Sequence, residues 1–184
     1  KHWNVNFSGQ FHQIEHHYTH LSSAFHVSNF EKAVVVSVDG FGDFSSAAWG
    51  VGSNTNIKID GRVFFPHSLG VFYQALTQWL GFLNYGDEYK VMGLASYGEP
   101  KYINKLSNVL QIENNGIFKL GLKYFSHHNS DINFNWSDGI PTIGRLFSNQ
   151  LIDLLGPQRE PNQDLSQYHK DIARSVQTMY ESAL

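Results

Sequence analysis

Residues 33–43 read Ala-Val-Val-Val-Ser-Val-Asp-Gly-Phe-Gly-Asp, and this stretch decides the fold class. Its first six residues form a nearly continuous β-branched run, which is typical of a strand buried on both faces of a sheet. The glycines and aspartates that follow favour a turn-rich loop. The stretch therefore predicts a strand that ends in a loop at Asp39, where open sheets commonly place their ligands.

The segments on either side of this strand add a helix and further strands. Histidines recur at helical spacing over residues 13–24, which predicts a helix before the strand. Asn54 and Asp60-Gly61 are turn signals, and they divide the chain after the loop into an antiparallel meander. Its expected strands are residues 45–52, 55–59 and 62–65.

The second half of the chain is mostly helical. Ser68 is a suitable N-cap for a helix that reaches Leu83, because its apolar residues recur at i, i+3 and i+4. A strand pair is expected around a turn at residues 114–116, and the polar stretch 125–139 predicts a long surface loop. Further helices are expected at residues 88–95, 101–110, 143–155 and 165–184. The predicted class is α/β or α+β.

The composition narrows the classes of function. The 184 residues carry a formal net charge of −3 and contain no run of Lys or Arg, which disfavours a nucleic-acid or anionic-membrane partner. No apolar run is long enough to span a bilayer. Cysteine is absent, so a metal ion would have to be held by His, Asp or Glu. These features predict one soluble domain, or a large piece of one.

Ten histidines are the unusual feature of the composition, and two of them have ligand spacing. His16 and His20 are four residues apart, so on a helix both side chains leave one face and can reach a single metal ion. Two histidines at this spacing are a weak motif, so the alternative is that His16 and His20 have no ligand role. Glu15 precedes His16 instead of following it, so the general base of a zinc protease would be misplaced, and a metalloprotease is not expected.

The sequence from Asp39 to Asp43 is the second candidate constellation. Glycines let the backbone turn sharply and expose amide N–H groups that can cradle a phosphate, while the carboxylates can hold a cation. The alternative is a hairpin turn in which Asp39 and Asp43 only accept hydrogen bonds from backbone amides.

Several motifs in order resemble the NodU/CmcH-type O-carbamoyltransferases. The strongest is Glu-Tyr-Lys-Val-Met-Gly-Leu-Ala-Ser-Tyr-Gly at residues 88–98, and the resemblance is weak between residues 100 and 160. The other matching segments are residues 15–20, 23–25, 28–30, 36–43, 65–73, 80–82, 169–173 and 175–177.

This resemblance implies part of an actin-like ATPase (ASKHA) domain, with a mixed sheet and flanking helices. It implies that His16, His20 and Asp39 bind Fe(II) or another divalent metal. It places Gly40, Phe41, Gly42 and Asp43 against phosphate and carbamoyl-adenylate, and it adds Lys90 to the nucleotide site. For Lys90 and Glu88, a solvated ion pair is the alternative. No residue is assigned as a catalytic base.

The resemblance further implies a cytoplasmic enzyme that uses carbamoyl phosphate and ATP to carbamoylate a hydroxyl of a sugar or natural product. Residues 1–184 correspond to an internal portion of the N-terminal domain, without the C-terminal YrdC-like domain, so we expect the isolated fragment to be inactive and to form homo-oligomers. A noncatalytic carbohydrate-binding module and a metallohydrolase with the same ligands are the alternatives. The enzyme hypothesis requires His16, His20 and Asp39 to converge on one point, and the binding-module hypothesis does not.

Overall fold

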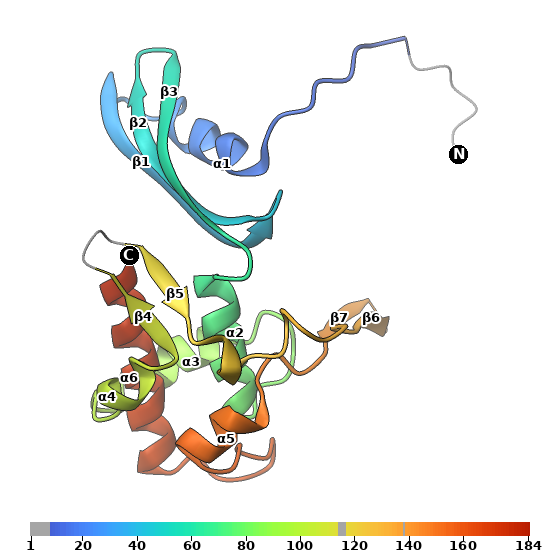
Figure 1. The fold of residues 1–184 in the computed structure, drawn as a ribbon, viewed down its shortest axis with the longest axis vertical. Coiled ribbons are helices and arrows are strands. Elements are labelled where there is room, and N and C mark those ends of the chain that lie inside the picture. Colours follow the sequence, from blue (N-terminus) through green and yellow to red (C-terminus); the bar gives the residue numbers. More distant parts are fainter. Residues whose placement is uncertain (1–7, 114–116, 138) are drawn as a thin grey trace.

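The computed structural model describes residues 8–113, 117–137 and 139–184, and these form two parts (Figure 1). The first part is a three-stranded sheet with one helix across it. The second part holds the remaining helices and two small hairpins. The elements of the first part are α1 (His16–Phe25), β1 (Lys32–Gly42), β2 (Ser45–Ser53) and β3 (Asn56–Phe64). Those of the second are α2 (Leu69–Trp79), α3 (Glu88–Ala95), α4 (Ile103–Leu106), β4 (Leu110–Ile112), β5 (Phe118–Leu120), the 3-10 turn η1 (Leu122–Tyr124), β6 (Phe134–Ser137), β7 (Ile140–Ile143), α5 (Asn149–Leu155) and α6 (Gln167–Ala183).

The predicted mixture of strands and flanking helices is confirmed, but the expected mixed sheet is antiparallel. The large sheet has the order β1-β2-β3, and the two hairpins are β4-β5 and β6-β7. Every strand pair among the residues that the structure describes is antiparallel. Hairpin connections account for this arrangement, because antiparallel neighbours need only a short turn between them.

The sheet is covered by α1 on one face only. Leu21 and Phe25 of α1 pack against Val35 of β1 and Ala48 of β2. Along β1 the alternate residues Val34 and Val36 are 76% and 57% exposed, so the prediction of a strand buried on both faces is wrong. A continuous valine run shows that both faces are apolar, but it does not show that another element covers each of them.

The expected turn at Asp60-Gly61 is a β-bulge instead. The register places Gly61 opposite Trp49 and Ile59 opposite Gly50, so Asp60 is the extra residue in β3. The strand therefore continues through this site, and the bulge bends it without ending it.

The main core forms around α2, as the apolar periodicity predicts. Phe72, Leu76 and Trp79 are completely buried in α2. The Ser68 hydroxyl accepts the Val71 N–H at 3.1 Å and so caps this helix. Ser68 also donates to the Gly40 carbonyl at 2.8 Å, so the start of α2 is tied directly to the end of β1.

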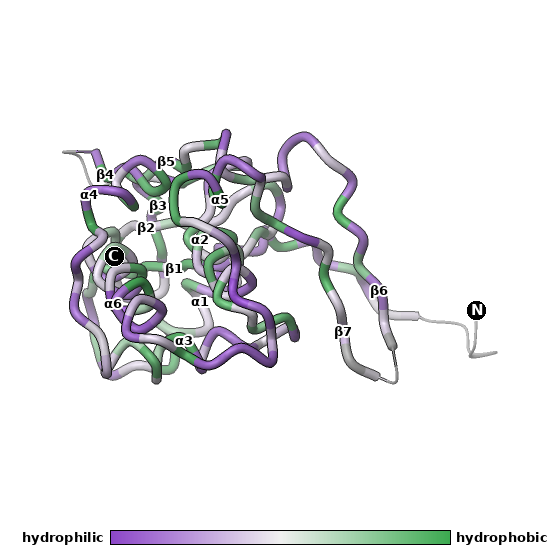
Figure 2. Tube along the Cα trace, turned by 90° about the horizontal axis from the view of Figure 1, so that it is seen from below, coloured by the Kyte–Doolittle hydropathy of each residue, from purple (hydrophilic) through white to green (hydrophobic). Residues whose placement is uncertain are grey.

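In the part of the chain after residue 100, several elements differ from expectation in their lengths. Of the helix expected at 101–110, only Ile103–Leu106 (α4) is helical. The helix expected at 143–155 begins later, at Asn149 (α5). The predicted loop 125–139 contains the strand β6. Figure 2 shows that the β6–β7 hairpin projects from the body of the molecule. The strand pair β4–β5 is confirmed, while its turn at 114–116 lies outside the described residues. Within the described part, no helix is long and apolar enough to cross a membrane.

Asp171 joins α6 to the loop that follows α3. Asp171 is 3% exposed, and its carboxylate accepts the Glu99 N–H at 2.9 Å, the Lys101 ammonium at 2.9 Å and the Gln167 side-chain amide at 2.8 Å. These three donors, the Glu99 N–H foremost, lower the pKa of Asp171 from 3.8 to about 2. The folded protein therefore binds this proton more weakly than the unfolded chain.

We expect Asp171→Asn to destabilise the protein at neutral pH, because the ion pair with Lys101 is lost. The stabilisation from Asp171 is fully present above the ordinary pKa of 3.8 and disappears as the pH falls toward about 2. Urea unfolding of both proteins over this range should show the difference in unfolding free energy shrinking as the pH falls. The exposed control Asp153→Asn should not alter this pH dependence, and an equal gap at every pH would contradict the assignment.

Candidate metal centre

The helix α1 begins where it does because Glu15 caps it. The Glu15 carboxylate accepts the backbone N–H groups of Tyr18 at 2.7 Å and of His17 at 3.1 Å. It also faces the Arg62 guanidinium at 3.4 Å. Burial raises the pKa of Glu15, but these backbone and Arg62 contacts outweigh it and lower the pKa below its ordinary value. A negatively charged cap at the N-terminal end also interacts favourably with the helix dipole.

A second carboxylate fixes the first residue of the helix to the sheet. Asp43 Oδ2 accepts the backbone N–H of His16 at 2.9 Å. Asp43 lies in the turn between β1 and β2, so this bond ties the start of α1 to the end of the hairpin. The expected contact of Asp43 with phosphate is untested, and the structure gives this side chain a helix-fixing role.

His16, His20 and Asp39 converge, as the enzyme hypothesis requires. His16 Nε2 lies 2.7 Å from Asp39 Oδ2, His20 Nε2 lies 3.3 Å from the same oxygen, and the two nitrogens are 3.0 Å apart. One ligand atom from each residue lies within 4.8 Å of the others. The histidines come from one face of α1 and the aspartate from β1, so the contact between these two elements builds the cluster.

The charge state of Asp39 suits a cation ligand. Burial raises its pKa, but contacts with His16, the Gly40 N–H and His20 outweigh burial and lower the pKa below its ordinary value. Oδ1 accepts the Gly40 N–H at 2.6 Å, which leaves Oδ2 directed at the histidines. The three side chains are 38–50% exposed, so a ligand from solution can reach them.

The donor set and its spacing fit a divalent transition metal. Two ligands of a tetrahedral or octahedral ion at about 2.1 Å lie about 3.0–3.4 Å apart, close to the distances between these three atoms. In this structure the same atoms also lie at hydrogen-bond distances from one another, so a bound cation would take the place of the protons between them. Imidazole nitrogen with carboxylate oxygen suits Fe or Zn better than Ca.

The segment from Asp39 to Asp43 is a strand end and a tight turn rather than a loop. β1 runs on through Gly42, which pairs with Ser45, so the turn consists of Asp43 and Phe44. Both have positive φ, 48° and 64°. Two such residues between paired strands form a type I′-like turn, whose twist matches that of the flanking strands.

The two glycines of this segment have different surroundings. A Cβ on Gly42 would overlap the His16 ring, whereas a Cβ on Gly40 would meet nothing within 4 Å. Gly42 is therefore needed for the close approach of a candidate ligand, and Gly40 is not. Phe41 packs its ring against Phe65 at 5.3 Å between centroids.

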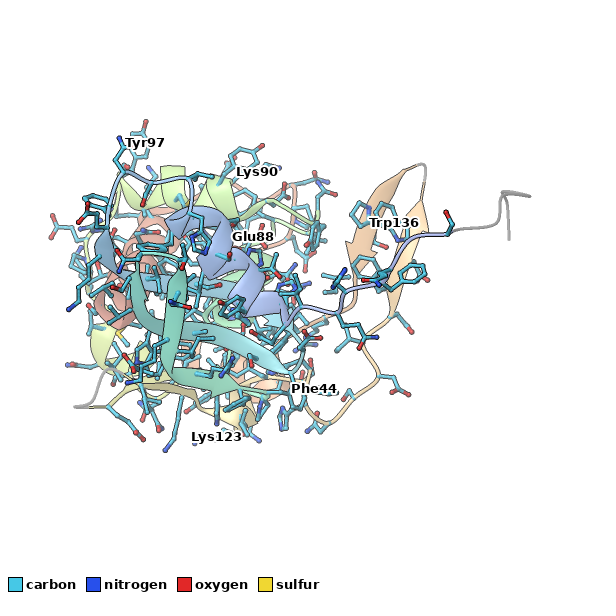
Figure 3. All side chains as sticks on the ribbon, turned by 90° about the horizontal axis from the view of Figure 1, so that it is seen from above. Phe44, Glu88, Lys90, Tyr97, Lys123 and Trp136 are labelled. Carbon is cyan, nitrogen blue, oxygen red and sulfur yellow. The ribbon has the colours of Figure 1, made fainter. Side chains whose placement is uncertain are left out.

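Lys90 is not brought to this cluster. Its ammonium pairs with Asp87 Oδ1 at 2.6 Å and lies near the rings of Phe82 and Tyr89. Figure 3 shows Lys90 and Phe44 at opposite edges of the molecule. The alternative of an ion pair agrees with the structure, although the partner of Lys90 is Asp87 and not Glu88. The role of Lys90 in nucleotide binding stays a prediction.

Sequence reasoning missed several residues that support the cluster. His17 is completely buried, and its Nδ1 lies 2.9 Å from the Ser37 hydroxyl. Nothing in the sequence distinguishes it from the exposed histidines, because the contact joins two distant segments. The capping role of Glu15 could have been predicted, because an acidic residue directly before a helical pattern is a start signal.

Comparisons with known proteins identify the family of the chain. Residues 4–184 match the family described as Carbamoyltransferase N-terminus. An uncharacterized protein of Synechocystis sp. is 37% identical over 172 residues, which cover 92% of this chain and 26% of that protein. Nodulation protein NolNO of Sinorhizobium fredii is 31% identical over 169 residues, 91% of this chain and 21% of that protein. Nodulation protein NolO of Bradyrhizobium diazoefficiens is 41% identical over 112 residues, 59% of this chain and 20% of that protein.

The chain spans between a fifth and about a quarter of the length of these relatives. The family match nevertheless runs over residues 4–184 and includes every residue of the cluster. The chain therefore belongs to the carbamoyltransferase N-terminus family.

Proposed function

We propose that this chain provides the metal-binding part of an O-carbamoyltransferase that modifies a hydroxyl of a sugar or natural product. The carbamoyl donor is carbamoyl-adenylate, which the full-length enzyme makes from carbamoyl phosphate and ATP. The observation that supports this proposal best is the convergence of His16, His20 and Asp39 on one point. The family match and the carbamoyltransferase motifs support the same reaction class. The relation of this domain to the actin-like ATPases (ASKHA) is part of the same proposal.

The residues of the cluster have distinct tasks in this proposal. His16 and His20 offer neutral nitrogen ligands, and Asp39 offers the negative charge. Fe(II) or another divalent ion bound there would polarise the carbamoyl carbonyl or hold phosphate oxygens. Gly40, Phe41, Gly42 and Asp43 lie at the adjoining strand end and would contact the carbamoyl donor there.

The transfer step involves no oxidation or reduction, so it needs no redox partner. The acceptor oxygen forms a bond to the carbamoyl carbon, the bond from that carbon to the adenylate phosphate oxygen breaks, and AMP leaves with the bonding electrons. The acceptor proton passes to solvent. The side chains of the cluster are about half-exposed, which leaves the site open to both substrates.

Titration calorimetry on the full-length protein with Zn(II), or with Fe(II) under anaerobic conditions, tests the metal site. We expect His16→Ala/His20→Ala to weaken binding more than about a hundredfold, because losing a residue that only supports a ligand already costs about 10–100-fold. The same variant should lose carbamoyl transfer. His26→Ala, an exposed histidine at the end of the same helix, is the matched control. Unchanged heat in the double variant would refute the site.

A metallohydrolase with the same ligands is the second candidate. The half-exposed cluster supports this second candidate, because a metal ion that faces solvent can also bind water as a nucleophile. Product analysis with carbamoyl phosphate separates the two: transfer yields a carbamoylated hydroxyl compound, and hydrolysis yields only small inorganic products. A noncatalytic carbohydrate-binding module would show neither product and would bind no metal.

The location and assembly of the protein are also proposals. We place it in the cytoplasm, where ATP is available. Val34 and Val36 leave an apolar strip on the uncovered face of the sheet, which supports self-association into homo-oligomers. A monomer at high concentration in sedimentation velocity would contradict this assembly.

A further inference from the structure

An open cleft adjoins the start of α1, next to the metal cluster. It has a volume of about 550 Å³, which is sufficient for a small ligand. The lining is mostly polar and carries carboxylate, amide and imidazole groups. Its lining residues are His12, Gln13, Ile14, Glu15 and Asp43. Glu15 and Asp43 also fix His16 in place, so the cleft and the metal cluster share a wall.

Phe44, next in the chain to the lining residue Asp43, has a backbone conformation that folding alone does not favour. It directly follows Asp43 in the turn, has a φ of 64° and is 82% exposed. The second position of a type I′ turn favours glycine, and a bulky side chain with positive φ is strained. Among the described residues no aromatic ring packs against Phe44. A strained and exposed phenyl ring next to a cleft points to a ligand rather than to packing.

The neighbouring surface extends this aromatic area. The Phe65 N–H donates to the Phe44 carbonyl at 2.8 Å, which joins the two residues at the end of the sheet. Phe64 and Phe65 are 57% and 46% exposed. Phe64 and Phe65 therefore add exposed aromatic surface at the end of β3, next to the turn that carries Phe44.

The charges indicate which ligand fits. Among the residues that the structure describes, no Lys or Arg lines the cleft, and the nearby Arg62 is already paired with Glu15. Asp43 uses only Oδ2 for His16, so within the described structure Oδ1 has no hydrogen-bond partner. Carboxylates repel an anionic ligand but accept hydrogen bonds from hydroxyl groups. Together with a phenyl ring that has no polar atom, this favours a neutral polyhydroxylated ring with one apolar face.

We propose that Phe44 and the cleft at the start of α1 bind the ring of the hydroxyl acceptor, with Phe44 stacked on its apolar face. This inference rests on the proposed transferase function and names the residues that select its acceptor. Phe44 acts as a specificity-determining residue, and the cleft directs the ring toward His16.

Saturation-transfer NMR on the full-length protein tests this site with methyl glycosides of glucose, N-acetylglucosamine and fucose, and with ADP as a separate probe. We expect glycoside binding to the wild type, about five- to tenfold weaker binding to Phe44→Gly, and near-normal binding to Phe44→Tyr. Gln13→Ala should also weaken it. Controls are Trp136→Ala, which removes an exposed aromatic on the projecting β6–β7 hairpin (Figure 3), and Asn54→Gly, in the turn between β2 and β3. Both should bind like the wild type.

Stability and metal binding separate the remaining outcomes. Phe44→Gly relieves the positive φ, so its melting temperature should rise while glycoside binding falls; a lower melting temperature with unchanged binding would show a structural role and overturn the inference. Loss of ADP binding instead of glycoside binding, or no glycoside binding to a wild type that binds Zn(II), would overturn it while leaving the metal site intact. A wild type that binds no metal contradicts the proposed function itself.

Discussion

Gly42→Ala should remove most of the metal affinity while leaving the fold intact. The new methyl group would overlap the His16 ring, so the ring has to turn away from His20 and Asp39. The obstacle is a half-exposed side chain and not backbone, so the protein can relieve it at little cost in stability. We expect the affinity for Zn(II) to fall about 10–100-fold, the range for disturbing the support of a ligand.

Gly40→Ala is the matched control for this change. It lies two residues away in the same strand, and its added methyl group would meet nothing within 4 Å. Calorimetry should therefore show near-normal Zn(II) binding, and thermal unfolding without metal should show little change in either variant. Equal loss of affinity in both variants would mean that the glycines matter for strand flexibility and not for the His16 approach.

Phe72→Ala should produce the largest loss of stability. Phe72 is completely buried in α2, and removing a buried phenyl ring costs about 3–5 kcal/mol in unfolding free energy. That is a large part of the roughly 5–15 kcal/mol available to a typical domain. Because α2 is tied to Gly40 through Ser68, we also expect weaker metal binding in this variant.

Urea unfolding measures this effect, with Phe30→Ala as the control. Phe30 is 68% exposed, so its loss should change the unfolding free energy by less than about 0.5 kcal/mol. A change below about 1 kcal/mol for Phe72→Ala would mean that α2 is not the centre of the core.

Local patterns predicted the elements, and tertiary contacts decided their lengths and coverage. The apolar period and the Ser68 cap located the start and the buried face of α2 correctly, because both signals lie within the helix itself, but the helix ends at Trp79 and not at Leu83. The valine run of β1 could not reveal that Val34 and Val36 are exposed, since coverage depends on other segments. Asp60-Gly61 looked like a turn because a bulge uses the same residue types, and only pairing with Trp49 distinguishes the two.

The candidate site was predictable where spacing fixes geometry. His16 and His20 lie one helical turn apart, and Asp39 follows from the resemblance to the carbamoyltransferases. Lys90 belongs to the best-matching motif, yet its nearest charged partner is Asp87. The strain at Phe44 could not be predicted, because it results from the pairing of Gly42 with Ser45.

Anomalous X-ray diffraction from crystals of the Zn(II)-loaded full-length protein tests the metal site most directly. We expect an anomalous peak about 2.0–2.2 Å from His16 Nε2, His20 Nε2 and one oxygen of Asp39, with at least one coordination position filled from outside these residues. An anomalous peak elsewhere in the protein, with these three side chains still joined only to one another, would contradict it.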